Sequence, residues 1–151
     1  MPYDPVLVQP FRDELISAGV RELRIGSEVD EVMNDKSGTL LIVVNSVCGC
    51  AAGAARPAIR KALLNQNKPE KITSVFAGQD LEATARAREY FVGLPPSSPA
   101  IALYKSGEMV HFIPRHRIEG RSGDDIANEL VMIFNKFCTK KNNFASDKKS
   151  Y

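Results

Sequence analysis

The stretch that decides the fold is Leu40-Leu41-Ile42-Val43-Val44-Asn45-Ser46-Val47-Cys48-Gly49-Cys50-Ala51-Ala52-Gly53-Ala54-Ala55. Its first part is a short, uninterrupted apolar run with β-branched residues, which is typical of a strand buried on both faces. Its last part is rich in alanine, and no β-branched residue interrupts the helix formers until Ile59. We therefore predict that Cys48 and Cys50 lie at a strand-to-helix junction. Free backbone N–H groups and the helix dipole stabilise a thiolate there, which indicates a redox site.

The overall composition bounds the kinds of protein that this sequence can encode. The 151 residues, 44% hydrophobic and 25% charged, fit one soluble domain with an ordinary core. The net charge of +2 comes without a dominant basic block, so we expect no binding to nucleic acid. The apolar runs are too short to span a bilayer and no signal peptide is visible, so we expect no membrane association. An odd number of cysteines, three, argues against a secreted disulfide framework and favours a cytoplasmic protein.

Hydrophobic periodicity and turn signals predict the other elements. Helices are expected at about 5–19, 27–33, 50–65 and 81–91 and after Asp124, and strands at 21–25, 39–46, 72–76, 100–104 and 109–113. Asp4, Ser27 and Asp124 are predicted to cap the first, second and last helices. Pro10 is expected to kink the first helix or to mark its true start, and Pro57 to bend the helix after the cysteines.

The order of these elements indicates the fold class. After the first helix it reads β-α-β-α-β-α-β-β-α, and the two-residue link Ser106-Gly107 permits only an antiparallel pair near the end. This order matches the thioredoxin-like α/β fold, a central mixed β-sheet flanked by helices, with one extra N-terminal helix. We therefore predict a single thioredoxin-like domain over residues 1–141 and a flexible C-terminal tail over residues 142–151.

The two close cysteines are predicted to have different roles. Only the thiolate is a nucleophile, its unperturbed pKa is ~8.5, and a helix N-terminus lowers that pKa by at most about one and a half units. Cys48 lies nearer the strand end and the solvent, so we expect it to attack, and we expect Cys50 to resolve. Gly49 best tolerates the tight ring of a disulfide between residues two apart, and such a strained disulfide would be readily reduced.

Two other interpretations of the cysteine pair stay open. Cys-x-Cys supplies two soft ligands, so a metal or iron–sulfur handling module is one alternative. The other soft donors are Cys138, His111 and His116, and no second close pair completes a structural zinc site, so we expect no bound metal or cofactor. Cys138 is most simply a packed residue of the last helix. The second alternative is a non-catalytic binding module that uses a groove beside Ser98-Pro99.

Ser98-Pro99 and the loop after the hairpin are expected beside the cysteines. In thioredoxin-like proteins a cis-proline just before this hairpin packs against the redox cysteines, and the backbone of Ser98 could then pair with an extended substrate. The second hairpin strand must return toward the cysteines, which brings Arg115, His116 and Arg117 to their side. These cations could lower the pKa of the attacking thiol or hold an anionic substrate, or they could form a solvated basic loop.

Five longer motifs carry a resemblance to one family. They are Val-Val-Asn-Ser-Val-Cys-Gly-Cys-Ala-Ala-Gly (43–53), Val-Phe-Ala-Gly-Gln-Asp (75–80), Arg-Glu-Tyr-Phe (88–91), Pro-Pro-Ser-Ser-Pro (95–99) and His-Phe-Ile-Pro-Arg-His (111–116). From the first helix to Cys138, the chain resembles the bacilliredoxin family. The resemblance implies a thioredoxin-like fold with a Cys-Gly-Cys site. It also implies thiol–disulfide oxidoreductase or isomerase activity that removes bacillithiol, a low-molecular-weight thiol, from mixed disulfides with client proteins.

The resemblance also implies roles for individual residues. Cys48 would attack the mixed disulfide and take the bacillithiol, and Cys50 or another bacillithiol would resolve it. The carboxylates of bacillithiol give Arg115, His116 and Arg117 an anionic partner. The residues expected to bind substrate or to surround the cysteines are Asn45, Gly49, Ser98, Pro99, Arg115 and His116. Unlike thioredoxins, the chain has no Trp and carries Ile42 in place of a buried Asp, so proton transfer during resolution needs another route.

Overall fold

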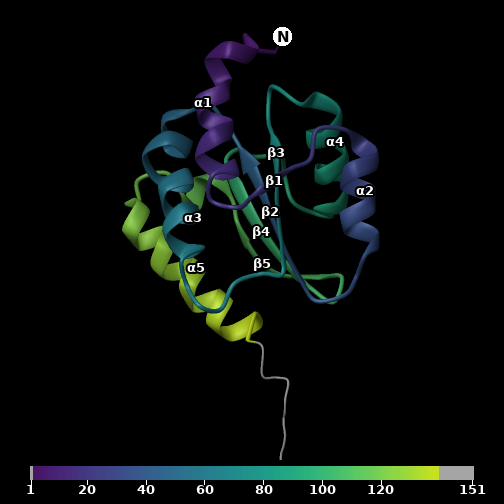
Figure 1. Cartoon of the computed structure of the whole chain (residues 1–151), viewed down its shortest axis with the longest axis vertical. Coiled ribbons are helices and arrows are strands. Elements are labelled where there is room, and N and C mark those ends of the chain that lie inside the picture. The colour runs from purple at the N-terminus through teal and green to yellow at the C-terminus, as the bar shows by residue number, and fades with distance from the viewer. Residues whose placement is uncertain (1, 140–151) are drawn as a thin grey trace, which may run out of the picture.

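The computed structural model describes residues 2–139, and their sheet is covered by helices on both faces (Figure 1). The strands are β1 (Arg21–Glu22), β2 (Thr39–Asn45), β3 (Lys71–Phe76), β4 (Ala100–Lys105) and β5 (Glu108–Ile113). The helices are α1 (Pro5–Ile16), α2 (Gly26–Asn34), α3 (Arg56–Ala62), α4 (Leu81–Tyr90) and α5 (Gly123–Phe137), with a π-helical turn η1 (Ala51–Ala55) and a 3-10 turn η2 (Arg115–Arg117). This order confirms the predicted α/β fold with its extra N-terminal helix. The predicted tail over 142–151 lies outside the described residues.

Strand β2 lies at the centre of the sheet, and all its residues are buried. The strand order is β1-β3-β2-β4-β5, with β2 parallel to β3 and antiparallel to β4. Leu41 and Val43 pack into the core with α1, α3 and α5, while Ile42 and Val44 pack into the core with α2 and α4. Figure 1 shows these two helical layers on opposite sides of the sheet. The apolar run is therefore a strand buried on both faces, as predicted.

Two predicted helix starts are wrong by one or two residues. Helix α2 begins at Gly26 with Ile25 as its N-cap, so Ser27 lies inside the helix and does not cap it. Helix α5 begins at Gly123, because the Ser122 hydroxyl accepts a hydrogen bond from the N–H of Asp125 at 3.1 Å. Ser122 thus accepts from a free N–H of the first turn. Asp124 lies within that turn, where its negative charge interacts favourably with the helix dipole.

Other boundaries near the N-terminus also follow from local hydrogen bonds. The Asp4 carboxylate accepts from the N–H of Val6, which confirms the predicted cap, and α1 continues through Pro10. Pro10 is therefore not the start of the helix. Strand β1 is shorter than predicted, because its ladder to β3 pairs two residues before the chain turns toward α2.

The helix after the cysteines is shorter and less regular than predicted. Pro57 has no N–H to donate to the carbonyl four residues earlier. The turn ahead of it is widened into the π-helical η1, where the N–H of Arg56 donates to the carbonyl of Ala51. Regular α3 ends at Ala62 instead of Asn65. Wide turns of this kind often lie at functional sites, and this one directly follows Cys50.

Candidate redox site

Cys48 and Cys50 lie where β2 ends and the following helix begins. The carbonyl of Cys48 accepts from the N–H groups of Ala51 and Ala52 at 3.1 and 3.2 Å, so the first turn starts at the cysteine pair. Both cysteines are partly buried free thiols. This placement confirms the predicted strand-to-helix junction.

The surroundings of Cys48 favour its thiolate. Partial burial opposes ionisation, but hydrogen bonds from the Ser46 hydroxyl, the Ala51 N–H and Cys50 outweigh it and lower the pKa of Cys48. The Ser46 hydroxyl also accepts the N–H of Cys48 at 3.2 Å, so one side chain contacts both the backbone and the sulfur of this residue. Cys48 therefore has the properties of the attacking nucleophile.

The surroundings of Cys50 favour its neutral thiol. Burial, the hydrogen bond to Cys48 and the charge of the Cys48 thiolate raise the pKa of Cys50. Arg115 opposes this increase and Glu119 adds to it. Two thiols that share one hydrogen bond thus divide into a thiolate and a thiol, as an attacker and a resolver require.

Asn45 is buried behind the cysteine loop. Its side chain is 2% exposed, and its Oδ1 accepts from the Ser46 N–H at 2.8 Å and from Arg56 Nη1 at 3.1 Å. Its Nδ2 donates to the carbonyl of Phe11 at 3.3 Å. Asn45 therefore holds the end of β2 and Ser46 in place behind the cysteines, and a part in binding substrate stays a prediction.

A buried arginine that the sequence did not single out lies behind the cysteine loop. Arg56 is 1% exposed, and its Nη1 donates to the carbonyl of Ser46 at 2.6 Å. Its guanidinium also lies over the ring of Phe11 and 3.2 Å from a carboxylate oxygen of Glu14. Arg56 thereby fixes the residue whose hydroxyl contacts the Cys48 sulfur.

The Ser98–Pro99 peptide bond is cis, as predicted, and Pro99 is buried. Ala100 pairs with Val44 across the sheet, so the register places Pro99 at the end of β2 from which the cysteines follow. The carbonyl of Ser98 accepts from Arg115 Nη1 at 3.4 Å. An extended substrate would therefore share that carbonyl with Arg115, and its predicted pairing with Ser98 stays a prediction.

Arg115 reaches the cysteines, whereas its neighbours serve other contacts. Its charge acts on the Cys50 thiol, and its Nε lies 3.3 Å from Glu119 Oε2. His116 is exposed on the same turn. Arg117 Nη2 donates to Glu129 Oε2 on α5 at 3.0 Å, so this cation is committed to a buried carboxylate. Of the three predicted cations, the structure brings Arg115 to the cysteine pair.

Gly49 adopts ordinary backbone angles in this structure. It is not among the glycines with positive φ, and a Cβ built there would meet no atom within 4 Å. The reduced site therefore has room for a side chain at this position. The expected benefit of glycine in closing a Cys48–Cys50 disulfide stays a prediction.

A carboxylate from a distant segment completes the site. Glu119 Oε2 lies 4.0 Å from the sulfur of Cys50, at hydrogen-bonding reach for a thiol. Glu119 is 69 residues away from Cys50 in sequence, and no local pattern marked it. Ser46 could have been identified from the sequence, because a serine hydroxyl commonly accepts a hydrogen bond from the N–H two residues later, here that of Cys48.

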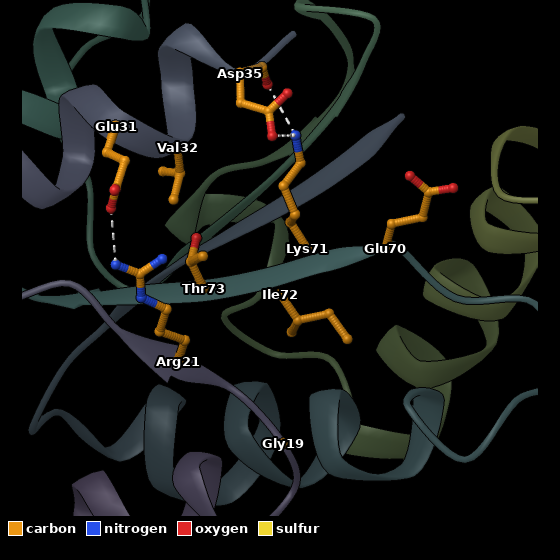
Figure 2. A pocket seen from close by; sticks show the side chains of 9 residues that line it. All are labelled: Gly19, Arg21, Glu31, Val32, Asp35, Glu70, Lys71, Ile72 and Thr73. Carbon is orange, nitrogen blue, oxygen red and sulfur yellow. Dashed lines mark hydrogen bonds and ion pairs between the residues drawn. The ribbon is translucent and has the colours of Figure 1, made fainter. Parts of the chain in front are cut away.

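An apolar hollow of about 310 Å³ adjoins the site on the side of the cis-proline. Its apolar lining comes from the Pro-rich loop and β5, and Arg115, His116 and Glu119 also line it. A separate cavity of about 480 Å³ lies where β2 and β3 begin, at the opposite end of these strands from the cysteines. Figure 2 shows two ion pairs among its charged side chains, Arg21 with Glu31 and Lys71 with Asp35. Of these two cavities, the hollow at the cis-proline loop is the nearer to the cysteine pair, because Arg115 and Glu119 line it.

Metal handling by Cys48 and Cys50 stays an alternative to be tested. Across residues 2–139, no group of three or more His, Cys, Asp or Glu side chains is arranged to hold a metal ion. Cys138 is 5% exposed and packs in the core with α5 and β4, which confirms its predicted structural role. The same part of the chain also holds no helix with the length and apolarity that crossing a membrane requires.

Comparison with known proteins decides the family. A family model described as disulphide isomerase matches residues 3–138. The bacilliredoxin of Geobacillus kaustophilus is 56% identical over 133 residues, covering 87% of this chain and 92% of the relative. The chain belongs to the bacilliredoxin family. A bacilliredoxin of Salinibacter ruber is 51% identical over 140 residues, which cover 91% of this chain and 82% of that protein.

Solved structures agree with the fold of this bacilliredoxin. The oxidised thioredoxin of Plasmodium falciparum superposes with a TM-score of 0.55 at 16% identity, covering 80% of this chain and all of that one. At such low identity the likeness shows the thioredoxin fold alone. Fold and family together establish a thiol–disulfide oxidoreductase type of protein.

Proposed function

We propose that this bacilliredoxin reduces mixed disulfides between client-protein cysteines and bacillithiol through Cys48 and Cys50. The observation that carries the proposal is the division of the two thiols. Cys48 has hydrogen bonds that lower its pKa, while Cys50 keeps its proton beside Glu119. This asymmetry supports a two-step thiol–disulfide exchange. We propose that the reaction takes place in the cytoplasm, where free thiols persist.

The proposed first step transfers the small thiol to the protein. The Cys48 thiolate attacks the bacillithiol sulfur, a Cys48–bacillithiol disulfide forms, and the client leaves as a thiolate that takes up a proton. In the second step Cys50 loses its proton and attacks Cys48, which releases bacillithiol and leaves a Cys48–Cys50 disulfide. A second bacillithiol thiolate can instead attack the bound one, giving oxidised bacillithiol and free Cys48. In the first route the two electrons come from Cys48 and Cys50, which end as a disulfide. In the second route they come from the two bacillithiol molecules, which end as oxidised bacillithiol, and Cys48 returns to its thiol form.

The cationic side chains around the site are suited to binding a small thiol that carries negative charge. The Arg115 guanidinium donates to the Ser98 carbonyl and its charge acts on Cys50, and His116 lines the adjoining hollow. Bacillithiol carries carboxylates, and a planar guanidinium pairs with a carboxylate through two hydrogen bonds. Arg115 and His116 are therefore proposed to hold these carboxylates, with the sulfur directed at Cys48.

The test uses one client protein carrying either bacillithiol or glutathione. Wild-type protein is expected to release the client thiol faster from the bacillithiol adduct. Cys50→Ser should accumulate a Cys48–bacillithiol adduct detectable by mass spectrometry, Cys48→Ser should be inactive, and Cys138→Ser should match wild type. Accumulation of the adduct on Cys48→Ser but not on Cys50→Ser would reverse the two roles. Full activity of Cys48→Ser would favour a binding module, and stoichiometric zinc or iron in the purified protein would favour metal handling.

Disulfide isomerisation is a second candidate function. The raised pKa of Cys50 slows its attack, so a client joined to Cys48 persists long enough for another client thiol to displace it. Cys50→Ser protein should then retain the ability to reactivate a protein with scrambled disulfides, while losing resolution of the bacillithiol adduct. Loss of both activities in Cys50→Ser would exclude isomerisation by Cys48 alone.

A further inference from the structure

Glu119 is the carboxylate that faces the thiol of Cys50. Its Oε2 lies 4.0 Å from the Cys50 sulfur and 3.3 Å from Arg115 Nε. Arg115 in turn donates to the carbonyl of Ser98, so it is held on the side of the cis-proline loop. One carboxylate oxygen is thus shared between a fixed cation and the thiol that must lose its proton.

The resolving step needs a group that accepts this proton. Strand β2 offers none, because Ile42 lies fully buried at the position where thioredoxins carry an acid, among the apolar side chains that face α2 and α4. The titratable groups that act most strongly on Cys50 are Cys48, Arg115 and Glu119. Cys48 is disulfide-bonded at this stage, and a guanidinium has donors but no acceptor. Glu119 is the acceptor that remains of the three.

We propose that Glu119 accepts the proton of Cys50 as Cys50 attacks the mixed disulfide on Cys48. The Cys50 S–H bond breaks and an O–H bond forms at Glu119 Oε2. The Cys50–Cys48 disulfide forms, and the bond from Cys48 to the small thiol breaks, with its electron pair leaving on that thiol. Glu119 then passes the proton to the leaving thiolate or to water. This assignment rests on the proposed function, in which Cys50 resolves.

The geometry indicates that Glu119 accelerates the resolving attack of Cys50 only moderately. The sulfur–oxygen distance is at the long end of hydrogen bonding, and the Glu119 side chain is 51% exposed, so water competes for the proton. A well-placed general base contributes ~100-fold or more, and for this exposed one we expect about tenfold on the resolving step. The attack by Cys48 comes first and does not need the Cys50 proton to leave.

Ellman's reagent separates the two steps with a coloured leaving thiol. Attack by Cys48 releases a first equivalent, and attack by Cys50 on the adduct releases a second. Glu119→Gln is expected to leave the first phase close to wild type and to slow the second about tenfold. Asp124→Asn, which removes an exposed carboxylate paired with Lys61, is the matched control and should slow neither phase. Protein with both Cys48→Ser and Cys50→Ser reports any colour that arises from Cys138.

A second measurement excludes a purely electrostatic role for Glu119. The negative charge of Glu119 helps to raise the pKa of Cys50, so Glu119→Gln should lower that pKa in a Cys48→Ser background, as followed by the pH dependence of alkylation. A lower pKa alone would speed resolution at neutral pH. A lower pKa together with a slower second phase therefore supports proton transfer, and an unchanged or faster second phase overturns it. If wild type releases a single equivalent, Cys50 does not resolve and the proposed function fails with this assignment.

Discussion

Replacing Ser46 with Ala tests how the protein activates Cys48. The hydroxyl of Ser46 accepts the Cys48 N–H at 3.2 Å and hydrogen-bonds the sulfur, which favours the thiolate. Ser46 itself is held by Asn45 Oδ1 at its N–H and by Arg56 Nη1 at its carbonyl. The hydroxyl is therefore in position before the thiolate forms, and removing it should raise the pKa of Cys48.

The size of the effect follows from the strength of one hydrogen bond to a charge. Such a bond contributes about 1.5–3 kcal/mol, which at ~1.4 kcal/mol per unit corresponds to about one to two pKa units. Cys48 is partly exposed, so water replaces part of the lost hydrogen bond. We expect Ser46→Ala to raise the pKa of Cys48 by about half to one unit and to slow its attack at neutral pH by about three- to tenfold.

The assay is the pH dependence of Cys48 alkylation in a Cys50→Ser background. Ser46→Thr retains the hydroxyl and should keep the pKa close to that of the parent. Ser37→Ala, which removes a hydroxyl bonded to Asp35 at a distant turn, controls for the loss of a serine. An unchanged or lowered pKa in Ser46→Ala would refute the activation of Cys48 by this side chain, as would equal shifts in Ala and Thr variants.

Two further predictions concern stability. Arg56→Met should lower the free energy of unfolding by about 2–4 kcal/mol in urea titrations, because the buried Ser46 carbonyl loses the arginine that donates to it and Asn45 Oδ1 loses one of its two donors. A loss below about 1 kcal/mol would contradict this. Burial raises the pKa of Glu129, but His111, Arg121 and Arg117 outweigh it and lower that pKa overall. The ionised carboxylate therefore stabilises the fold fully at a pH above the unfolded pKa of ~4.3, and this stabilisation is lost as the pH falls through the folded pKa. Glu129→Gln should therefore destabilise at neutral pH and differ less from wild type near about pH 3, and a difference independent of pH would count against this role.

The parts of the fold that sequence predicts well depend on local patterns. The run from Leu40 to Val44 needed no partner to be recognised as a buried strand, because continuous β-branched residues are typical of one. Helix starts are harder to predict. Ser27 and Asp124 are both residue types that commonly cap helices, yet neither is the N-cap of its helix. The position of the cap depends on which side chain reaches a free N–H, as Ser122 does, and that geometry is set by the packing of the whole helix.

The surroundings of the cysteines were predictable only in part. Arg56 stands directly before a proline in a helix, where a charged residue usually faces solvent, yet it is buried against Ser46 and Phe11. Its burial depends on α1 covering it, which a local pattern does not specify. Glu119 reaches Cys50 because the hairpin returns the chain to the same end of the sheet, so its contact depends on topology.

These two origins give the two thiols partly separate controls. Ser46, fixed by Arg56 within the strand-to-helix segment, acts on Cys48, whereas Glu119 from the segment after β5 acts on Cys50. Arg115 from that same segment acts on both thiols. Substitutions in the first segment should therefore alter the attack on the mixed disulfide, and substitutions in the second should alter its resolution. Because the rate of resolution decides how long any adduct on Cys48 persists, we propose that changes after β5 would alter the balance between the proposed reduction and isomerisation without changing the nucleophile.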